Sequence, residues 1–107
     1  MSAGDRGRFN KLLEPGQIGR VKTRNRIVKT AAALAYRDDN YLVTERIKDF
    51  YEAIARGGVG LLIVESTTFD YPLGHHLFSP RIDDDKCIPG FSEVTQVIHK
   101  YGCPTFL

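Results

Sequence analysis

The 107-residue chain lacks tryptophan and has only two cysteines, Cys87 and Cys103. Neither belongs to a Cys-x-x-Cys pair or to a cysteine–histidine ladder, so we expect no disulfide framework and no metal site. The chain also lacks a large excess of one charge, because it has 15 Lys and Arg and 13 Asp and Glu, which gives a net charge of +2. Nucleic-acid binding usually shows as a stripe of clustered basic residues, so nucleic acid is not an expected partner.

Long apolar segments are missing as well. The longest uninterrupted stretch, residues 59–64, has six residues, whereas a membrane-spanning helix needs about 20. Residues 1–8 are polar and basic without the apolar core of a secretory signal, which predicts a cytoplasmic protein without a membrane partner. With 42% hydrophobic and 26% charged residues, the composition is that of an ordinary soluble globular domain.

The first third of the chain predicts short extended pieces. Residues 1–11 are expected to be a flexible start, and residues 12–19 read as a small hairpin around a Pro15–Gly16 turn, because proline presets the first turn angle. Residues 26–30 form a candidate strand. The alanine-rich stretch 31–35 that follows has helix propensity but neither a cap nor a polar face.

The remainder alternates helix and strand. Thr44 is a plausible cap for a helix at Glu45–Arg56, whose apolar residues recur at helical spacing. Residues 59–64 are apolar at successive positions, which is typical of a strand buried on both faces of a parallel sheet. After a long excursion at residues 67–89, a second amphipathic helix is predicted at 90–101 and a strand at 103–107.

This order predicts an α/β fold with a parallel sheet, and ligands of such sheets bind at the carboxyl ends of the strands. Those ends fall at residues 30–33 and 65–68, which are rich in small residues that leave the backbone accessible to a flat ligand. Neither Gly-x-Gly-x-x-Gly nor a P-loop motif occurs. Three parallel strands with two helices make a poor autonomous fold, because a parallel sheet needs cover on both faces.

Six stretches, in this order and spacing, carry a family resemblance: residues 13–19, 24–28, 43–45, 57–65, 88–91 and 99–102. They resemble the start of the old yellow enzyme family, the FMN-dependent NADH:flavin oxidoreductases that include ene-reductases and 2,4-dienoyl-CoA reductases. The resemblance implies a (β/α)8 TIM barrel, which has about 250 residues in its generic form. Residues 12–107 would then be its N-terminal portion, comprising a hairpin, about two βα units and the start of strand three.

The resemblance also implies site residues. Thr30, Ala31, Ala32 and Ala33 align with the family's Ala-Pro-Met-Thr/Cys stretch, whose backbone lies against the flavin, so only backbone contacts are expected here. Ser66 takes the place of an alanine or glycine beside the flavin. FMN is the implied cofactor and NAD(P)H the hydride donor, with an iron–sulfur cluster and FAD only if a longer C-terminal part exists.

The implied reaction passes hydride from the flavin to an activated C=C of a small-molecule substrate, with enoyl- or aryl-CoA compounds among the candidates. No catalytic residue falls within the chain, which we expect to be inactive without the rest of the barrel or a partner copy. The competing hypothesis is a non-catalytic α/β interaction module, or a barrel piece completed by another chain. A third hypothesis is a phosphate-binding TIM barrel that holds no flavin.

Several other polar residues have a structural interpretation that outweighs a functional one. Lys29 is expected to bend its amine to solvent, and Arg24 and Arg26 stand at the start of a strand, on the stability face of a barrel. His75 and His76 are expected to be solvent-exposed, residues 83–85 to cap the following helix or form a solvated turn, and Cys103 to fill the core. Tyr36 and Tyr41 could border a pocket, and a reactive role for Cys87 stays open.

Overall fold

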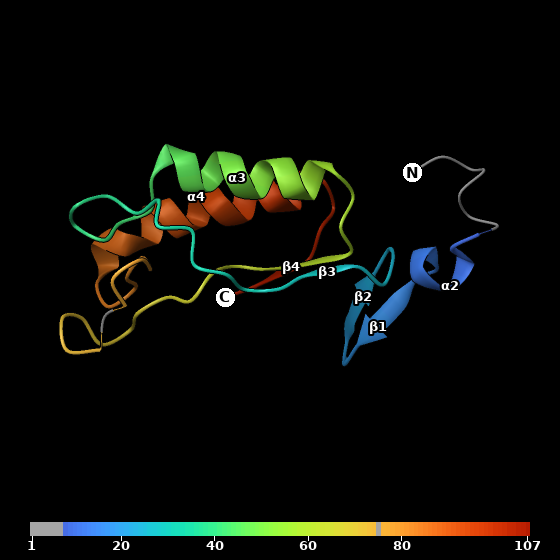
Figure 1. The fold of residues 1–107 in the computed structure, drawn as a ribbon, viewed down its shortest axis with the longest axis horizontal. Helices are drawn as coiled ribbons and strands as arrows, with labels where there is room; N and C mark the ends of the chain where they lie inside the picture. Colours follow the sequence, from blue (N-terminus) through green and yellow to red (C-terminus); the bar gives the residue numbers. More distant parts are fainter. Residues whose placement is uncertain (1–7, 75) are drawn as a thin grey trace.

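The computed structural model describes residues 8–74 and 76–107, and its strands and helices alternate as predicted (Figure 1). The order of elements is α2 (Asn10–Leu13), β1 (Gly16–Ile18), β2 (Val21–Thr23), β3 (Val28–Lys29), α3 (Glu45–Arg56), β4 (Leu61–Ile63), the 3-10 helix η1 (Asp85–Cys87), α4 (Ile88–His99) and β5 (Thr105–Phe106). Strands β1 and β2 form an antiparallel hairpin. Strands β3, β4 and β5 form a parallel sheet in that order.

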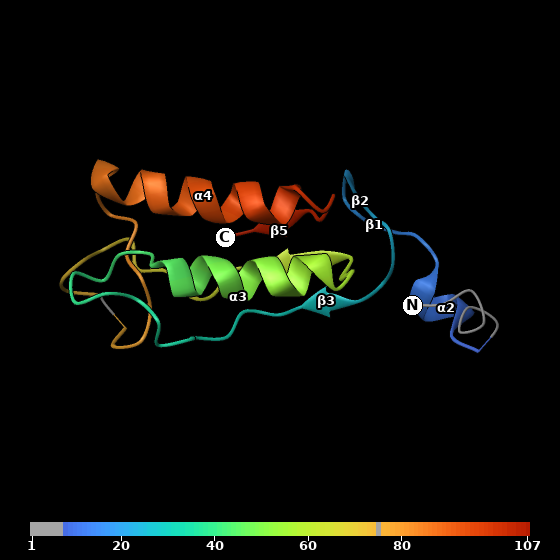
Figure 2. The same cartoon turned by 90° about the horizontal axis from the view of Figure 1, so that it is seen from above.

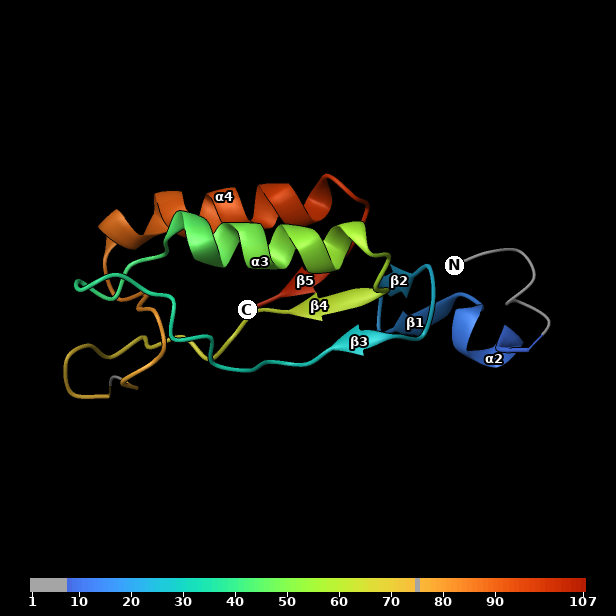
Figure 3. The same cartoon turned by 45° about the horizontal axis from the view of Figure 1, so that its top comes forward.

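The parallel sheet and two helices form two layers. Figure 3 shows β3, β4 and β5 side by side and pointing the same way, with Lys29 opposite Leu62 and Leu62 opposite Thr105. Helices α3 and α4 lie next to each other over one face of this sheet (Figures 1 and 2). The hairpin lies at the opposite end of the strands from the long loops.

Helix α3 begins and ends where the sequence predicts. The Thr44 hydroxyl oxygen accepts a hydrogen bond from the Ile47 amide at 3.3 Å, which satisfies one of the free donors at the helix start. Ile47, Tyr51 and Ala55 recur every four residues and are buried against the sheet. Gly58, at φ +103°, takes the left-handed conformation that lets the chain turn back into β4.

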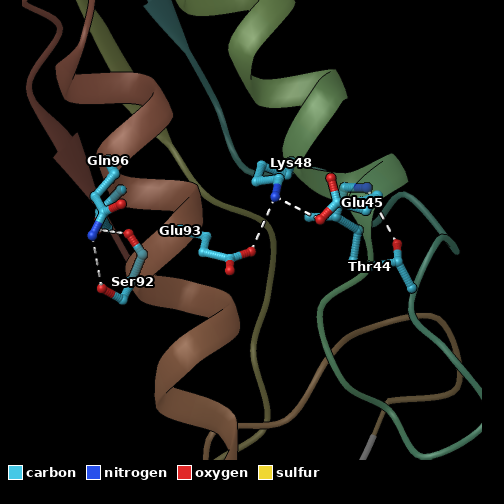
Figure 4. Close-up of polar contacts among 8 residues, drawn as sticks. Thr44, Glu45, Lys48, Ser92, Glu93 and Gln96 are labelled. Carbon is cyan, nitrogen blue, oxygen red and sulfur yellow. Dashed lines mark hydrogen bonds and ion pairs between the residues drawn. The ribbon is translucent and has the colours of Figure 1, made fainter.

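Helix α4 begins two residues earlier than predicted, because the Asp84 carboxylate accepts from the Lys86 amide and starts η1, which runs directly into α4. Phe91, Val94 and Ile98 are its buried face, as the spacing predicts. The two helices are also joined across their exposed side. The Lys48 ammonium lies 2.6 Å from Glu45 and 3.0 Å from Glu93 on α4, as Figure 4 shows.

The hairpin is present, but its predicted turn is wrong. The turn lies at Gly19, where φ is +58°, and Gly16 is already the first residue of β1. Leu12 and Leu13 belong to α2 instead of an extended piece, since the Leu13 amide donates to the Phe9 carbonyl. A glycine in the left-handed region matches the twist of a tight hairpin, which a Pro–Gly pair before the strand does not supply.

Two further expectations concern the ends of predicted segments. The flexible start at residues 1–11 falls largely on residues 1–7, outside those that the structure describes, and its last two residues begin α2. The alanine-rich stretch 31–35 forms no helix despite its propensity. It leaves β3 as irregular backbone and ends at Ala35 with φ +62°.

The face of the sheet opposite α3 and α4 carries apolar side chains. Val28 is 39% exposed and Phe106 is 40% exposed, and β3 and β5 are the edges of the sheet. Leu61, opposite Val28 in the sheet, is only 2% exposed, so it is the edge strands that are left partly open on this face. None of the helices in the described residues is long and apolar enough to cross a membrane.

Candidate functional site

The predicted cofactor contacts come together at one edge of the sheet. Since β3 and β4 are parallel, residues 30–33 and residue 66 leave the sheet in the same direction, toward the loop end in Figure 1. Thr30, Ala31, Ala32 and Ala33 are all exposed. Within residues 8–74 and 76–107, nothing hydrogen-bonds the backbone N–H or C=O groups of residues 31–33. These groups are therefore available to a ligand.

Glu65 joins the two strand ends, and the sequence reasoning missed it. Its side chain is buried, with the residue only 2% exposed, and its Oε2 atom accepts a hydrogen bond from the Leu34 amide at 2.9 Å. Its own amide donates to the Tyr51 hydroxyl oxygen at 2.8 Å. The hydrogen bond between Leu34 and Glu65 therefore links the residue after Ala33 to the residue before Ser66. The available signal was a carboxylate directly after the apolar stretch 59–64.

The surroundings of Glu65 disfavour a negative charge. Burial raises the pKa of Glu65, and the Leu34 amide and the positive charge of Lys29 oppose that shift without cancelling it. The Oε1 atom is buried and has no hydrogen-bond partner in the described part of the chain. Burial also raises the pKa of Tyr51, which therefore stays a neutral phenol under ordinary conditions.

Ser66 begins a chain of hydrogen bonds into the following loop. Its Oγ lies 2.5 Å from Oγ of Ser79, which is 1% exposed and lies 3.3 Å from Nδ1 of His76. The Phe78 amide also donates to Nδ1, so this nitrogen is an acceptor. That favours Ser79 as donor to His76 and Ser66 as donor to Ser79. The Ser66 oxygen keeps lone pairs for a further donor.

A groove of about 300 Å³ lies beside this chain of hydrogen bonds, lined by residues 66–70 together with Gly74 and His76. The loop that forms it is anchored across its base, because the Thr68 amide donates to the Pro80 carbonyl at 3.0 Å and the Ile82 amide donates to the Thr68 carbonyl at 2.7 Å. His76 is exposed, as expected. His75 lies outside the described residues, and among those that are described no His, Cys, Asp and Glu cluster could hold a metal ion.

The basic residues before β3 have structural roles, as expected, whereas in the acidic run only Asp84 acts as the predicted cap and Asp83 pairs with Arg81. Arg24 donates to the carbonyl oxygens of Ala55, Val59 and Tyr101 at 2.8–3.3 Å, which ties the ends of both helices to the sheet. Arg26 forms a 3.5 Å ion pair with Glu14. Asp83 binds the Arg81 guanidinium through both carboxylate oxygens, at 2.5 and 2.7 Å.

The remaining candidates are packed into the fold. Tyr36 contacts Phe50 edge-on and lies under the Arg46 guanidinium at 3.8 Å, and Tyr41 lies under Arg37 at 4.3 Å. Neither tyrosine lines the groove. Both cysteines are buried free thiols, and burial raises the pKa of Cys103, as expected for a core residue. The Lys29 amine bends back to the Thr30 carbonyl.

The fold and the strand-end site define this chain as the first part of a parallel α/β barrel with a ligand face at the carboxyl ends of its strands. The family model for the NADH:flavin oxidoreductase / NADH oxidase family matches residues 11–107, and the chain belongs to that family. The fold expectation, an N-terminal part of a (β/α)8 barrel preceded by a hairpin, is therefore confirmed.

Individual relatives agree. An NADH oxidase of Thermoanaerobacter brockii is 41% identical over 100 residues, which is 92% of this chain and 15% of that protein. An N,N-dimethylglycine/sarcosine dehydrogenase of Chromohalobacter salexigens is 36% identical over 97 residues, 88% of this chain and 14% of that protein. The solved structure of the old yellow enzyme from Trypanosoma cruzi aligns with a TM-score of 0.83 and 28% identity, covering 94% of this chain and 26% of that one.

Proposed function

We propose that this chain forms the N-terminal part of an FMN-dependent oxidoreductase of the ene-reductase type. NAD(P)H is the proposed hydride donor, and a small molecule with an activated C=C bond is the proposed acceptor. When bound, FMN supplies the two-electron chemistry that links the two. The observation that carries the proposal is the exposed backbone of residues 31–33 after β3, which has no partner among the described residues, in a chain of this family.

The residues at the strand ends suit a flat ring. Ala31, Ala32 and Ala33 have no side-chain atoms beyond Cβ, so a ring can approach their N–H and C=O groups closely. Ser66, beside them at the end of β4, is exposed and small. With its hydroxyl engaged to Ser79, its oxygen acts toward the ring as a hydrogen-bond acceptor. We infer that these contacts hold and orient FMN, and that none of them moves a proton.

The groove beside Ser66 extends the proposed site toward substrate. Hydroxyl groups, Phe69, Asp70 and the His76 ring line it, and Ser66, one of the proposed flavin contacts, is part of its wall. We infer that the substrate reaches the flavin past this loop, with enoyl- and aryl-CoA compounds as the first substrates to assay. We assign no catalytic acid or base to these 107 residues.

The chain spans about a quarter of the Trypanosoma cruzi enzyme, and we propose that the rest of a barrel covers the Val28 and Phe106 face. Without that cover we expect no activity from this chain. An iron–sulfur cluster and FAD enter the proposal only if a longer C-terminal part is present. We also propose that the protein is located in the cytoplasm.

The test is to purify the full-length protein, record its visible spectrum and identify any released flavin by mass. Flavin absorbance that bleaches on anaerobic addition of NADH or NADPH is the expected result. Protein without flavin absorbance, and with no affinity for added FMN, would refute the proposal and favour the non-catalytic interaction module.

A pair of variants tests the contact surface itself. Ala32→Leu places a branched side chain where the ring is proposed to lie, and we expect FMN affinity to fall by about tenfold or more, or about 1.4 kcal/mol. Ala53→Leu makes the same change at an exposed position of α3, away from the strand ends, and should leave FMN affinity unchanged. Equal affinities for the two variants would contradict the assignment of residues 30–33.

A further inference from the structure

Glu65 is a buried residue whose side chain and backbone amide bond two separate parts of the chain. It is 2% exposed, its Oε2 accepts from the Leu34 amide at 2.9 Å, and its amide donates to Tyr51 of α3 at 2.8 Å. A carboxyl group is rarely buried this deeply, because removing it from water costs more than removing an apolar side chain of the same size. The fold therefore retains at this position a group that is not there for stability alone.

The geometry of β3 shows what the group does. The pairing between β3 and β4 ends at Lys29 and Leu62, and residues 31–33 then run on without a backbone partner in the described part of the chain. The Leu34 amide is the next backbone group that the sheet holds, and Glu65 Oε2 is the atom that holds it. One hydrogen bond thus sets where the unpaired stretch 31–33 ends.

We propose that Glu65 is a positioning residue, which holds the backbone of residues 30–33 at the spacing from Ser66 that flavin binding requires. The inference rests on the proposed function, since it concerns the same contacts. In this role Glu65 positions residues 30–33 by accepting the hydrogen bond from the Leu34 amide, and the negative charge of the carboxylate is not needed.

Two observations support an acceptor role over a charge role. Lys29 acts on Glu65 only through its charge, because its amine bonds the Thr30 carbonyl, and no ion pair to the Glu65 carboxylate is present among residues 8–74 and 76–107. Burial also outweighs that charge and raises the pKa of Glu65, which favours the neutral acid. A neutral acid still accepts from the Leu34 amide through its carbonyl oxygen.

Three substitutions in the full-length protein separate the possibilities. Glu65→Gln keeps an acceptor of the same reach, Glu65→Asp keeps the carboxyl group but withdraws the acceptor by one methylene, and Glu65→Leu removes the acceptor. Ile98→Val is the control for a plain loss of stability. Ile98 is fully buried near the end of α4 that is remote from the carboxyl ends of the strands, and the change costs about 0.5–1.5 kcal/mol.

FMN affinity of the apoprotein, measured by quenching of flavin fluorescence, and the visible spectrum of the bound flavin are the first readouts. We expect Glu65→Asp and Glu65→Leu to weaken FMN binding by about tenfold or more and to shift the flavin bands. Glu65→Gln should behave as the wild type, and Ile98→Val should melt earlier with unchanged FMN affinity. Wild-type affinity in Glu65→Asp, or an equal loss in Glu65→Gln, would overturn the inference. If Glu65→Leu fails to fold, Glu65→Asp carries the test.

Hydrogen exchange separates a failure of the inference from a failure of the proposed function. In the apoprotein, peptides covering residues 30–35 should exchange faster in Glu65→Asp than in wild type and Glu65→Gln. A wild-type protein that binds no flavin refutes the proposed function, and the exchange rates still decide whether Glu65 anchors this stretch. Unchanged exchange in Glu65→Asp refutes the anchor itself.

Discussion

Gly60→Ala is the substitution for which the structure predicts the largest effect from the smallest chemical change. Gly60 lies directly before β4, and its amide donates to the Ile27 carbonyl at 2.9 Å. A Cβ atom added there would lie 2.5 Å from Oδ1 of Asn25 and closer still to the Asn25 carbonyl oxygen. Both distances are well inside van der Waals contact, so either Asn25 or the start of β4 must move.

Asn25 has no room to yield, which sets the magnitude. It is 8% exposed, its Nδ2 donates to the Gly58 carbonyl at 2.7 Å and its Oδ1 accepts from the Ile27 amide at 3.0 Å. Overpacking of this kind costs about 1–3 kcal/mol, and each buried group left without its partner adds about 1–3 kcal/mol. With one of these bonds broken, we expect Gly60→Ala to destabilise the protein by about 2–6 kcal/mol.

Gly57→Ala is the matched control, three residues earlier in the same connection. Gly57 has φ −68° and ψ −13°, which alanine adopts freely, and its nearest contact to an added Cβ is the Ile54 carbonyl oxygen at 3.3 Å. Its effect should stay within about 1 kcal/mol of wild type, because the lower flexibility of the unfolded chain offsets the cost of this contact. Melting temperatures and soluble yields of the two full-length variants are the measurement, and equal melting of both would refute the packing argument.

Three other predictions test separate contacts. Arg24→Ala removes a guanidinium shared by three backbone carbonyls and should lower the free energy of unfolding by on the order of 1–3 kcal/mol. Arg26→Ala removes an exposed ion pair and should change it by no more than about 0.5 kcal/mol. Equal losses in chemical denaturation would contradict this. Tyr51→Phe leaves the buried Glu65 amide without its acceptor and should lower stability by about 1–3 kcal/mol, measured as the shift in denaturation midpoint, with an unshifted midpoint as the contrary result. The raised pKa of Glu65 means that the folded protein binds the carboxyl proton more tightly than the unfolded chain does. The stability that this proton binding contributes is complete below the ordinary pKa of 4.5. It is lost as the pH rises through the pKa of Glu65 in the folded protein. Melting of wild type and Glu65→Gln across this interval should show the Gln variant gaining relative to wild type with rising pH, and a constant difference would show that burial does not raise this pKa.

Local patterns sufficed for most elements of the fold. Thr44, with apolar residues at helical spacing after it, predicts α3 with correct bounds, because capping and one-sided burial depend on neighbours in sequence. The apolar run at residues 59–64 predicts a buried parallel strand, and β4 lies within it. The hairpin turn was misplaced because Pro15–Gly16 and Gly19–Arg20 are both plausible turns. Only the backbone at Gly19 shows which is used.

The candidate site divides in the same way. Small residues at the two strand ends, and the family resemblance of the motifs around them, single out residues 30–33 and Ser66 from the sequence. The bonds that organise this region join residues far apart in the chain, with Leu34 bound to Glu65 and Ser66 bound to Ser79. No periodicity or spacing encodes such pairs.

The sequence by itself thus determined the alternation of helices and strands, the direction of the sheet and the family, because each depends on residues close together or on ordered motifs. Tertiary structure alone decided that the alanine-rich stretch leaves β3 as unpaired backbone, with Leu34 held by a carboxylate 31 positions later. Helix propensity at residues 31–35 amounts to a few tenths of a kcal/mol per residue. The pairing of β3 with β4 before this stretch and the bond from the Leu34 amide to the buried Glu65 side chain outweigh it, since they hold both ends of residues 31–33 in place.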